Sequence, residues 1–114
     1  MPYIAINTSL QLSDAQKEKL KTELGRLITI IPTKTEAGLL IDFSGGRTMY
    51  KAGENVSGAF IELRLFHKSE FDPKKQFTEA CFEMLSRELG LKKENMYLNI
   101  LEFENWGSAG IFKS

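Results

Sequence analysis

Residues 3–43 read YIAINTSLQLSDAQKEKLKTELGRLITIIPTKTEAGLLIDF, and this stretch predicts a strand, a helix and a second strand. At its start Ile4 and Ile6 alternate with smaller or polar neighbours over residues 3–8, which is the period of a strand. Residues 37–43 contain three consecutive apolar side chains, and such a run is typical of a strand that is covered on both faces.

The segment between these two strands has a clear helical start and stop. Ser13, followed three residues later by Gln16, matches a capping box and predicts the first turn of a helix. Leu20 and Leu24 begin a series of apolar residues at helical spacing, and lysines occupy the opposite face. Pro32 lacks a backbone N–H group and therefore ends the helix.

The second half of the chain repeats the same order. Residues 59–66 alternate between apolar and polar positions and predict a strand. Asp72 as the N-cap and Pro73 as the first helical residue predict the start of a second helix. Gly90 predicts the left-handed end of this helix, and residues 96–103 predict the last strand.

Two strand–helix–strand units, joined by a loop at 47–58 with at most one short strand, predict a single α+β domain over residues 1–114. Each βαβ unit pairs its strands in parallel, and right-handed crossovers place both helices on one face of a four-stranded mixed sheet. The other face would expose the apolar residues of 39–41 and 98–103. The economical cover for such a face is another copy of the chain, so the sequence predicts a homo-oligomer.

Composition narrows the function classes. Fifteen Lys+Arg balance fifteen Asp+Glu, which argues against a protein that coats nucleic acid. Cys81 is the single cysteine, and no spacing of ligand residues predicts a metal site. No apolar run approaches the roughly 20 residues of a membrane span, and the N-terminus lacks the pattern of a signal peptide. We therefore expect a cytoplasmic protein that uses no cofactor and binds neither nucleic acid nor membrane.

Few residues offer catalytic chemistry. His67 has no local Ser or Cys partner, and Cys81 lies on an apolar helix stripe, so both are interpreted as structural. Pro2 is different, because removal of Met1 would leave a secondary amine on a rigid ring at the head of a strand. A Met-Pro start ordinarily indicates only that Met1 is removed, with no catalytic role for the proline. A desolvated amine, however, has a lowered pKa and is a competent general base near neutral pH.

Several motifs together resemble the tautomerase superfamily and, within it, the macrophage migration inhibitory factor family. They are MPYI at residues 1–4 leading a strand, the doubled βαβ order, NMYLN at 95–99, and NWG at 105–107 followed by Phe112. The resemblance covers nearly the whole chain. It implies a homotrimer whose three sheets form a central barrel with the helices outside, which would supply the predicted cover.

The resemblance also implies an activity, the interconversion of keto and enol forms of phenylpyruvate-like aromatic 2-keto acids with Pro2 as general base. Lys34 matches the family lysine that faces the substrate carboxylate, and Phe66 falls where a strand-end backbone amide contacts the substrate. Tyr97 and Asn99 would line the pocket from the neighbouring subunit. Alternation along a strand independently places these two side chains on one face of the sheet.

Departures from the family pattern keep two alternatives open. Ser108 stands where relatives often carry an aromatic residue, which favours a cytokine-like binding protein with vestigial activity. Such a protein would be secreted without a signal peptide and would engage a host receptor. Arg47 or Arg64 reaching the pocket would instead favour hydratase, dehalogenase or decarboxylase chemistry, because these reactions need a further cation or an activated water.

Overall fold

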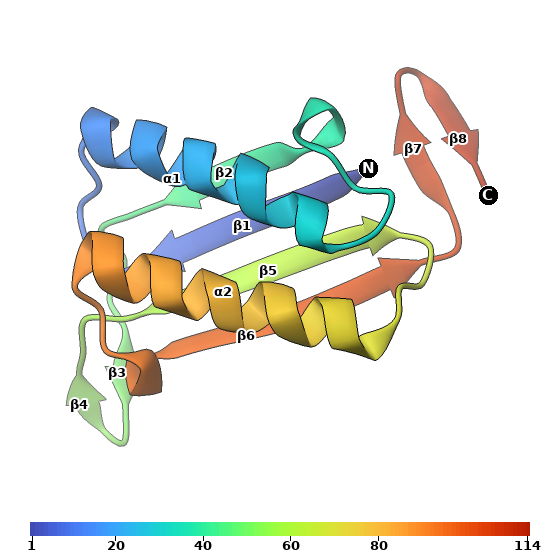
Figure 1. Ribbon diagram of the computed structural model, residues 1–114. Helices are drawn as coiled ribbons and strands as arrows, with labels where there is room; N and C mark the ends of the chain where they lie inside the picture. The colour runs from blue at the N-terminus through green and yellow to red at the C-terminus, as the bar shows by residue number, and fades with distance from the viewer.

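The computed structural model describes residues 1–114, and its main elements are one sheet and two helices (Figure 1). In chain order they are β1 Pro2–Thr8, α1 Asp14–Leu27, β2 Leu40–Ser44, β5 Ala59–Phe66, α2 Phe71–Leu89 and β6 Met96–Phe103. Two short hairpins lie outside this sheet: β3 Tyr50–Lys51 with β4 Glu54–Asn55, and β7 Trp106–Ser108 with β8 Ile111–Lys113.

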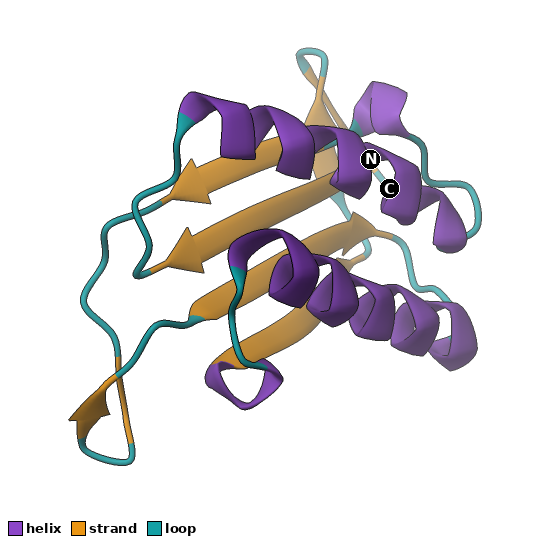
Figure 2. Ribbon diagram, turned by 60° about the vertical axis from the view of Figure 1, so that its left-hand side comes forward, coloured by secondary structure: helices purple, strands orange, loops and turns teal.

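The order of strands in the sheet is β2-β1-β5-β6. β1 is parallel to β2 and β5 is parallel to β6, whereas the central neighbours β1 and β5 are antiparallel. Each βαβ unit therefore pairs its own strands in parallel, and the two units meet along their first strands. Figure 2 shows both helices on the same face of the sheet. The predicted α+β fold with two βαβ units and a mixed four-stranded sheet is confirmed.

The core lies between the two helices and one face of the sheet. Ile4 and Ile6 of β1 and Leu63 of β5 point to this side and are fully buried, because successive strand side chains alternate between faces. The opposite face, here called the outer face, is exposed in the single chain and carries Leu40, Phe60, Tyr97, Leu101 and Phe103. That another copy of the chain covers the outer face stays a prediction.

The ends of α1 and α2 follow local capping chemistry at two of the predicted positions. The Ser13 hydroxyl oxygen accepts a hydrogen bond from the Gln16 N–H (3.1 Å), and the Gln16 side-chain oxygen accepts one from the Ser13 N–H (2.9 Å). Gly90 ends α2 in the left-handed region, with φ of 70°. The predicted capping box and the predicted glycine stop are both confirmed.

The predicted start of α2 is wrong. The helix begins at Phe71 after Glu70, rather than at Pro73 after Asp72, and Glu70 makes no side-chain capping bond. The first N–H groups of a helix have no partner within the helix, so a proline is tolerated anywhere in the first turn and does not mark its first residue.

Three other segments differ from expectation. β2 begins at Leu40 instead of residue 37, because Glu36–Gly38 form a 3-10 turn. The loop at 47–58 contains the β3–β4 hairpin, and the chain after β6 folds into the β7–β8 hairpin. Both hairpins turn on an Ala-Gly pair with positive φ at both residues, 52° and 79° in the first and 51° and 79° in the second.

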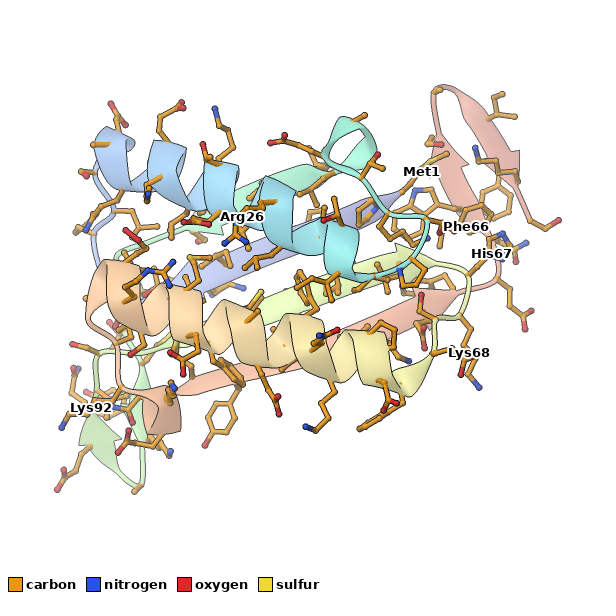
Figure 3. All side chains as sticks on the ribbon, in the orientation of Figure 1. Met1, Arg26, Phe66, His67, Lys68 and Lys92 are labelled. Carbon is orange, nitrogen blue, oxygen red and sulfur yellow. The ribbon has the colours of Figure 1, made fainter.

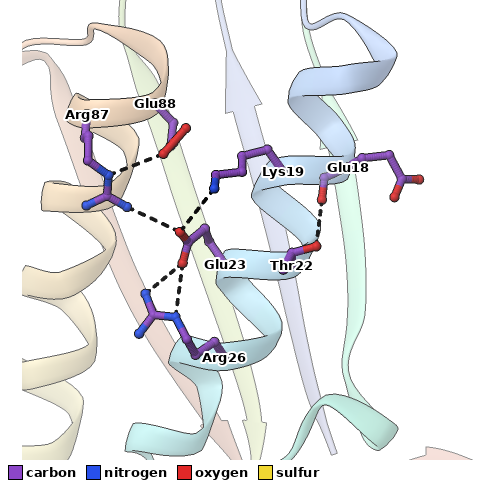
Figure 4. A network of polar contacts seen from close by, with 7 residues as sticks. All are labelled: Glu18, Lys19, Thr22, Glu23, Arg26, Arg87 and Glu88. Carbon is purple, nitrogen blue, oxygen red and sulfur yellow. Dashed lines mark hydrogen bonds and ion pairs between the residues drawn. The ribbon is translucent and has the colours of Figure 1, made fainter.

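Glu23 of α1 joins the two helices on their solvent side (Figure 4). Its carboxylate lies 2.7 Å from a guanidinium nitrogen of Arg26 and 3.5 Å from one of Arg87, which belongs to α2. The hydrogen bond from Arg26 is the main reason that the pKa of Glu23 lies below its ordinary range. Ion pairs at a surface contribute little to stability, so the apolar layer beneath holds the helices in place.

Candidate active site

A cavity of about 720 Å³ opens at the end of the sheet where β1 begins. Residues from β1, β2, β5, β6 and the β7–β8 hairpin line it. Pro2 is part of this lining, together with the aromatic side chains of Phe103, Trp106 and Phe112. A concave, largely apolar space of this size suits a small organic molecule.

Pairing in the sheet fixes Pro2 in place. Pro2 is the first residue of β1, is buried, and pairs with Leu65 of β5. Met1 precedes it, and the sulfur of Met1 accepts a hydrogen bond from the Ser108 hydroxyl at 2.7 Å. The pKa of the Met1 amine lies below its ordinary value, first because of burial and then because of the cations Lys34 and Lys113. A Pro2 amine, exposed by removal of Met1, would stand one residue further along the same strand.

Lys34 is a buried cation at the same end of the sheet. A left-handed residue, Thr33 with φ of 71°, turns the chain after the end of the first helical region and leads into Lys34. Lys34 is only 8% exposed, and its ammonium donates a hydrogen bond to the backbone carbonyl oxygen of Phe66 at 2.8 Å. Burial lowers the pKa of Lys34, and the charge of Glu102 acts in the opposite direction.

Phe66 lies at the end of β5, where several aromatic rings gather. The His67 ring stacks on the Phe66 ring with centroids 3.8 Å apart, and the Trp106 ring lies 6.2 Å from Phe66. Figure 3 shows Met1, Phe66 and His67 at the same end of the molecule. His67 has a positive φ of 72°, and its backbone N–H donates to the carbonyl oxygen of Phe103 at 2.8 Å. A contact between the Phe66 amide and a substrate stays a prediction.

Tyr97 and Asn99 do not meet Pro2 within one chain. Tyr97 aligns with Phe60 near the start of β5, whereas Pro2 pairs near its end, so several residues of strand separate them at about 3.3 Å each. Tyr97 instead lines a second cavity, of about 230 Å³, beside the β3–β4 hairpin. Tyr97 and Asn99 are both exposed on the outer face, as alternation predicts. They can complete the Pro2 site only from another copy of the chain.

No local pattern in the sequence predicts the aromatic wall of the cavity. Trp106 and Phe103 have ring centroids 6.2 Å apart, and Phe112 closes the lining from β8. Ser108 cannot supply an aromatic ring, but these three side chains do. The available signal was the apolar spacing after residue 103, which without an Asn-Gly or Asp-Gly turn did not predict a hairpin.

The two arginines singled out from the sequence differ in position. Arg64 lines the cavity that contains Pro2. Arg47 does not, and its guanidinium donates to the side-chain oxygens of Asn7 at 3.4 Å and Ser44 at 3.2 Å. Of the two arginines that hydratase, dehalogenase or decarboxylase chemistry would use, only Arg64 therefore lines the cavity.

Two other kinds of chemical group are the single thiol and the possible metal ligands. Cys81 is fully buried, and burial raises the pKa of its thiol to about 12, so it is present as an unreactive small apolar group. No three His, Cys, Asp or Glu side chains come together in a way that could hold a metal ion. Neither helix has the length and apolar character that crossing a bilayer requires.

The sequence model of the macrophage migration inhibitory factor (MIF) family matches residues 1–111. The chain belongs to the MIF family. A search of curated proteins by sequence finds no match to this MIF-family chain.

Solved structures with the same fold are similar over almost the whole chain. MIF2 from Leishmania major has a TM-score of 0.92 at 18% identity, covering 99% of this chain and 97% of that one. Pt0534 inactivated by 2-oxo-3-pentynoate has a TM-score of 0.83 at 17% identity, covering 95% and 92%. Fused 4-OT, described as an asymmetric trimer, has a TM-score of 0.83 at 14% identity, covering 96% and 94%. At these identities the likeness concerns the fold.

Proposed function

We propose that this MIF-family chain is a keto–enol tautomerase of phenylpyruvate-like aromatic 2-keto acids, with Pro2 as general base once Met1 is removed. The observation that carries the proposal is the buried Pro2 at the head of β1, in the lining of a cavity walled by aromatic rings. Lys34 is not part of that lining, but its charge acts on the neighbouring Met1 amine. The inactivation of Pt0534, a protein of the same fold, by the 2-oxo acid 2-oxo-3-pentynoate supports this choice of substrate class.

In the proposed step, the lone pair of the Pro2 nitrogen takes a proton from the carbon next to the keto group. The C–H electron pair becomes a carbon–carbon double bond, the carbonyl electron pair moves to oxygen, and that oxygen takes a proton from water. The protonated Pro2 amine then gives its proton to the hydroxide so formed, which restores the base. Burial and the charge of Lys34 lower the pKa of the Met1 amine, and both would act on a Pro2 amine in the same direction. The neutral amine that the step needs is thereby favoured.

Lys34 and the aromatic wall would hold the substrate at its two ends. An ammonium group has three donors, and Lys34 uses one of them on the Phe66 carbonyl, so donors remain for a carboxylate. The rings of Trp106 and Phe103 offer an apolar wall to the aromatic ring of the substrate.

The direct experiment follows the conversion of phenylenolpyruvate to phenylpyruvate in the ultraviolet, with the intact mass of the same sample showing whether Met1 is absent. We expect catalysed conversion by a chain that begins at Pro2. No catalysis by a folded chain that has lost Met1 would overturn the proposal, and retention of Met1 would do so as well, because an acylated nitrogen is no base.

We further propose that the working site is shared between copies of the chain in a homotrimer, with Tyr97 and Asn99 supplied by a neighbour. The exposed outer face and the trimer of fused 4-OT support this. Light scattering should then give three times the chain mass of 12.9 kDa. Mixed trimers of Pro2→Ala and Asn99→Ala chains should regain activity that neither variant has alone, because some interfaces join an intact Pro2 to an intact Asn99. A monomer in solution, or mixed trimers without regained activity, would contradict this arrangement.

A second candidate is hydratase, dehalogenase or decarboxylase chemistry in the same cavity, and the observation in its favour is Arg64 in the lining. Proton NMR of the products separates this candidate from the tautomerase, because tautomerisation moves one proton and leaves the composition of the substrate unchanged. A host receptor and a cytoplasmic location stay predictions.

A further inference from the structure

Glu102 is an acidic residue near the end of β6 that faces the helix side of the sheet. Its neighbours Leu101 and Phe103 are exposed on the outer face, so alternation along the strand turns Glu102 to the opposite face. The Glu102 side chain is 21% exposed, so its carboxylate has lost much of its contact with water. A carboxylate in such a place needs partners within the protein.

Both oxygens of the Glu102 carboxylate have a partner on the segment that follows β5. One oxygen accepts a hydrogen bond from the backbone N–H of Ser69 at 2.6 Å, and the other accepts one from the Lys74 ammonium at 2.9 Å. Ser69 belongs to the turn between β5 and α2, and Lys74 lies in the first part of α2. Glu102 therefore fastens this turn and the start of α2 to the end of β6.

The turn that Glu102 fastens carries the hydrogen-bond acceptor of Lys34, which is the Phe66 carbonyl oxygen. His67 follows Phe66 (Figure 3) and has a φ of 72°, a backbone conformation that side chains other than glycine rarely adopt. Such a conformation persists only where surrounding contacts hold it. Two bonds to β6 do so here, one from the His67 N–H and the one that Glu102 accepts. The place of the Lys34 ammonium thus depends on a turn that Glu102 holds.

Glu102 also acts on Lys34 through its charge. Burial lowers the pKa of Lys34, and the charge of Glu102 raises it, although the two groups are not joined in an ion pair. The charges that act on Glu102 or on the Met1 amine in this region are those of cations, namely Lys34, Lys68, Lys74 and Lys113. An ammonium that is buried near other cations loses its proton more readily, and the Glu102 carboxylate opposes this loss.

We propose that Glu102 is a positioning residue that acts through Lys34: it fastens the turn after β5, and its negative charge keeps the Lys34 ammonium available to a substrate carboxylate. This inference rests on the proposed function for the contact between Lys34 and the substrate. The link between Glu102 and Lys34 itself does not depend on the reaction. Glu102 touches neither the substrate nor the proton that moves.

The first test needs no substrate. Carbon-13 NMR of the Lys34 Cε atom, assigned with Lys34→Arg, follows the titration of this ammonium directly. Glu102→Gln keeps an oxygen for the Ser69 N–H but removes the charge, so the pKa of Lys34 should fall. Glu79→Gln is the matched control, because it removes an exposed carboxylate of α2 that does not act on Lys34, and it should leave this pKa in place. An unchanged Lys34 pKa in Glu102→Gln would overturn the proposal, whether or not the chain is a tautomerase.

The second test separates this role from a merely structural ion pair. Glu102→Gln should raise KM for phenylenolpyruvate about tenfold and leave kcat nearly unchanged, a loss of the size of one weakened charge-assisted hydrogen bond. The rise should be larger at alkaline pH, where the variant loses the Lys34 charge first. Lys74→Met breaks the same ion pair but leaves the carboxylate, so it should lower the urea midpoint of unfolding without raising KM.

The conservative variant completes the design. Glu102→Asp keeps the charge and should restore KM to within about threefold of the wild type, because the lost hydrogen bond is then only lengthened. Equal effects of Lys74→Met and Glu102→Gln on KM would assign Glu102 to stability alone and contradict the proposal. A fall in kcat with unchanged KM in Glu102→Gln would contradict it as well, since it would place Glu102 in the proton transfer.

Discussion

Pro2→Ala is expected to lower kcat/KM for phenylenolpyruvate by about a hundredfold or more, the lower end of what a positioned general base contributes. An N-terminal alanine still presents an amine after removal of Met1. Its primary amine, however, lacks the ring that holds the nitrogen rigid at the head of β1. The variant should unfold at nearly the same urea concentration as the wild type, because the β1 pairing from Tyr3 onward is unchanged.

The dependence of kcat/KM on pH provides a second measurement of the role of Pro2. The wild-type kcat/KM should fall tenfold per pH unit on the acid side, since protonation of the Pro2 amine removes the base. Burial and the charge of Lys34 lower the pKa of the Met1 amine and should act on a Pro2 amine in the same direction, so this acid limb should lie at lower pH than for an exposed N-terminal proline. Pro73→Ala, which removes a proline of α2 that is not in the lining of the cavity, should leave both rate and profile nearly unchanged. Equal rates for Pro2→Ala and wild type across the pH range would refute the role of Pro2.

Lys34→Ala should lower kcat/KM by about a hundredfold. The variant loses one charge-assisted hydrogen bond to the substrate carboxylate, and the loss of the buried side chain disturbs the site around it. The fall should appear mainly in KM, because Lys34 is placed to bind the substrate and does not take its proton. The variant also leaves the Phe66 carbonyl without its donor, and we expect a loss of about 1.5–3 kcal/mol in the free energy of unfolding.

The kinetic pKa separates this role from a merely structural one. The charge of Lys34 contributes to the lowered pKa of the Met1 amine and should act likewise on a Pro2 amine, so removing that charge should raise this pKa and move the acid limb of the profile to higher pH. Lys34→Arg should keep the acid limb near its wild-type position. Lys68→Gln, which removes an exposed cation at the same end of the molecule, is the control and should have little effect (Figure 3). An acid limb that does not move in Lys34→Ala would contradict the electrostatic coupling.

The candidate site was partly predictable because some of its features are local. Pro2 could be placed at the head of a strand because Ile4 and Ile6 show the strand period next to it. Tyr97 and Asn99 could be placed on one face by the same period. The proposed role of Lys34 came only from the family resemblance, because nothing in its neighbours in sequence marks a lysine that will be buried.

The predictions were wrong for segments whose sequence is compatible with more than one local structure. The start of α2 was misplaced because Asp72 and Pro73 fit several positions in a first helical turn equally well. The β7–β8 hairpin was missed because Ala109-Gly110 is an unusual pair for a turn that needs positive φ twice. That hairpin carries Trp106 and Phe112, so the wall of the cavity was missed with it.

The sequence by itself determined the order of the elements, the doubled βαβ arrangement and the two sides of each strand, because hydrophobic period and capping act between residues close in the chain. Only the tertiary structure decided that the Lys34 ammonium meets the Phe66 carbonyl, and that Trp106 and Arg64 line the same cavity as Pro2. These contacts join segments far apart in the chain. Each depends on the pairing of β1 with β5 and the path of the chain after β6, which no local pattern specifies.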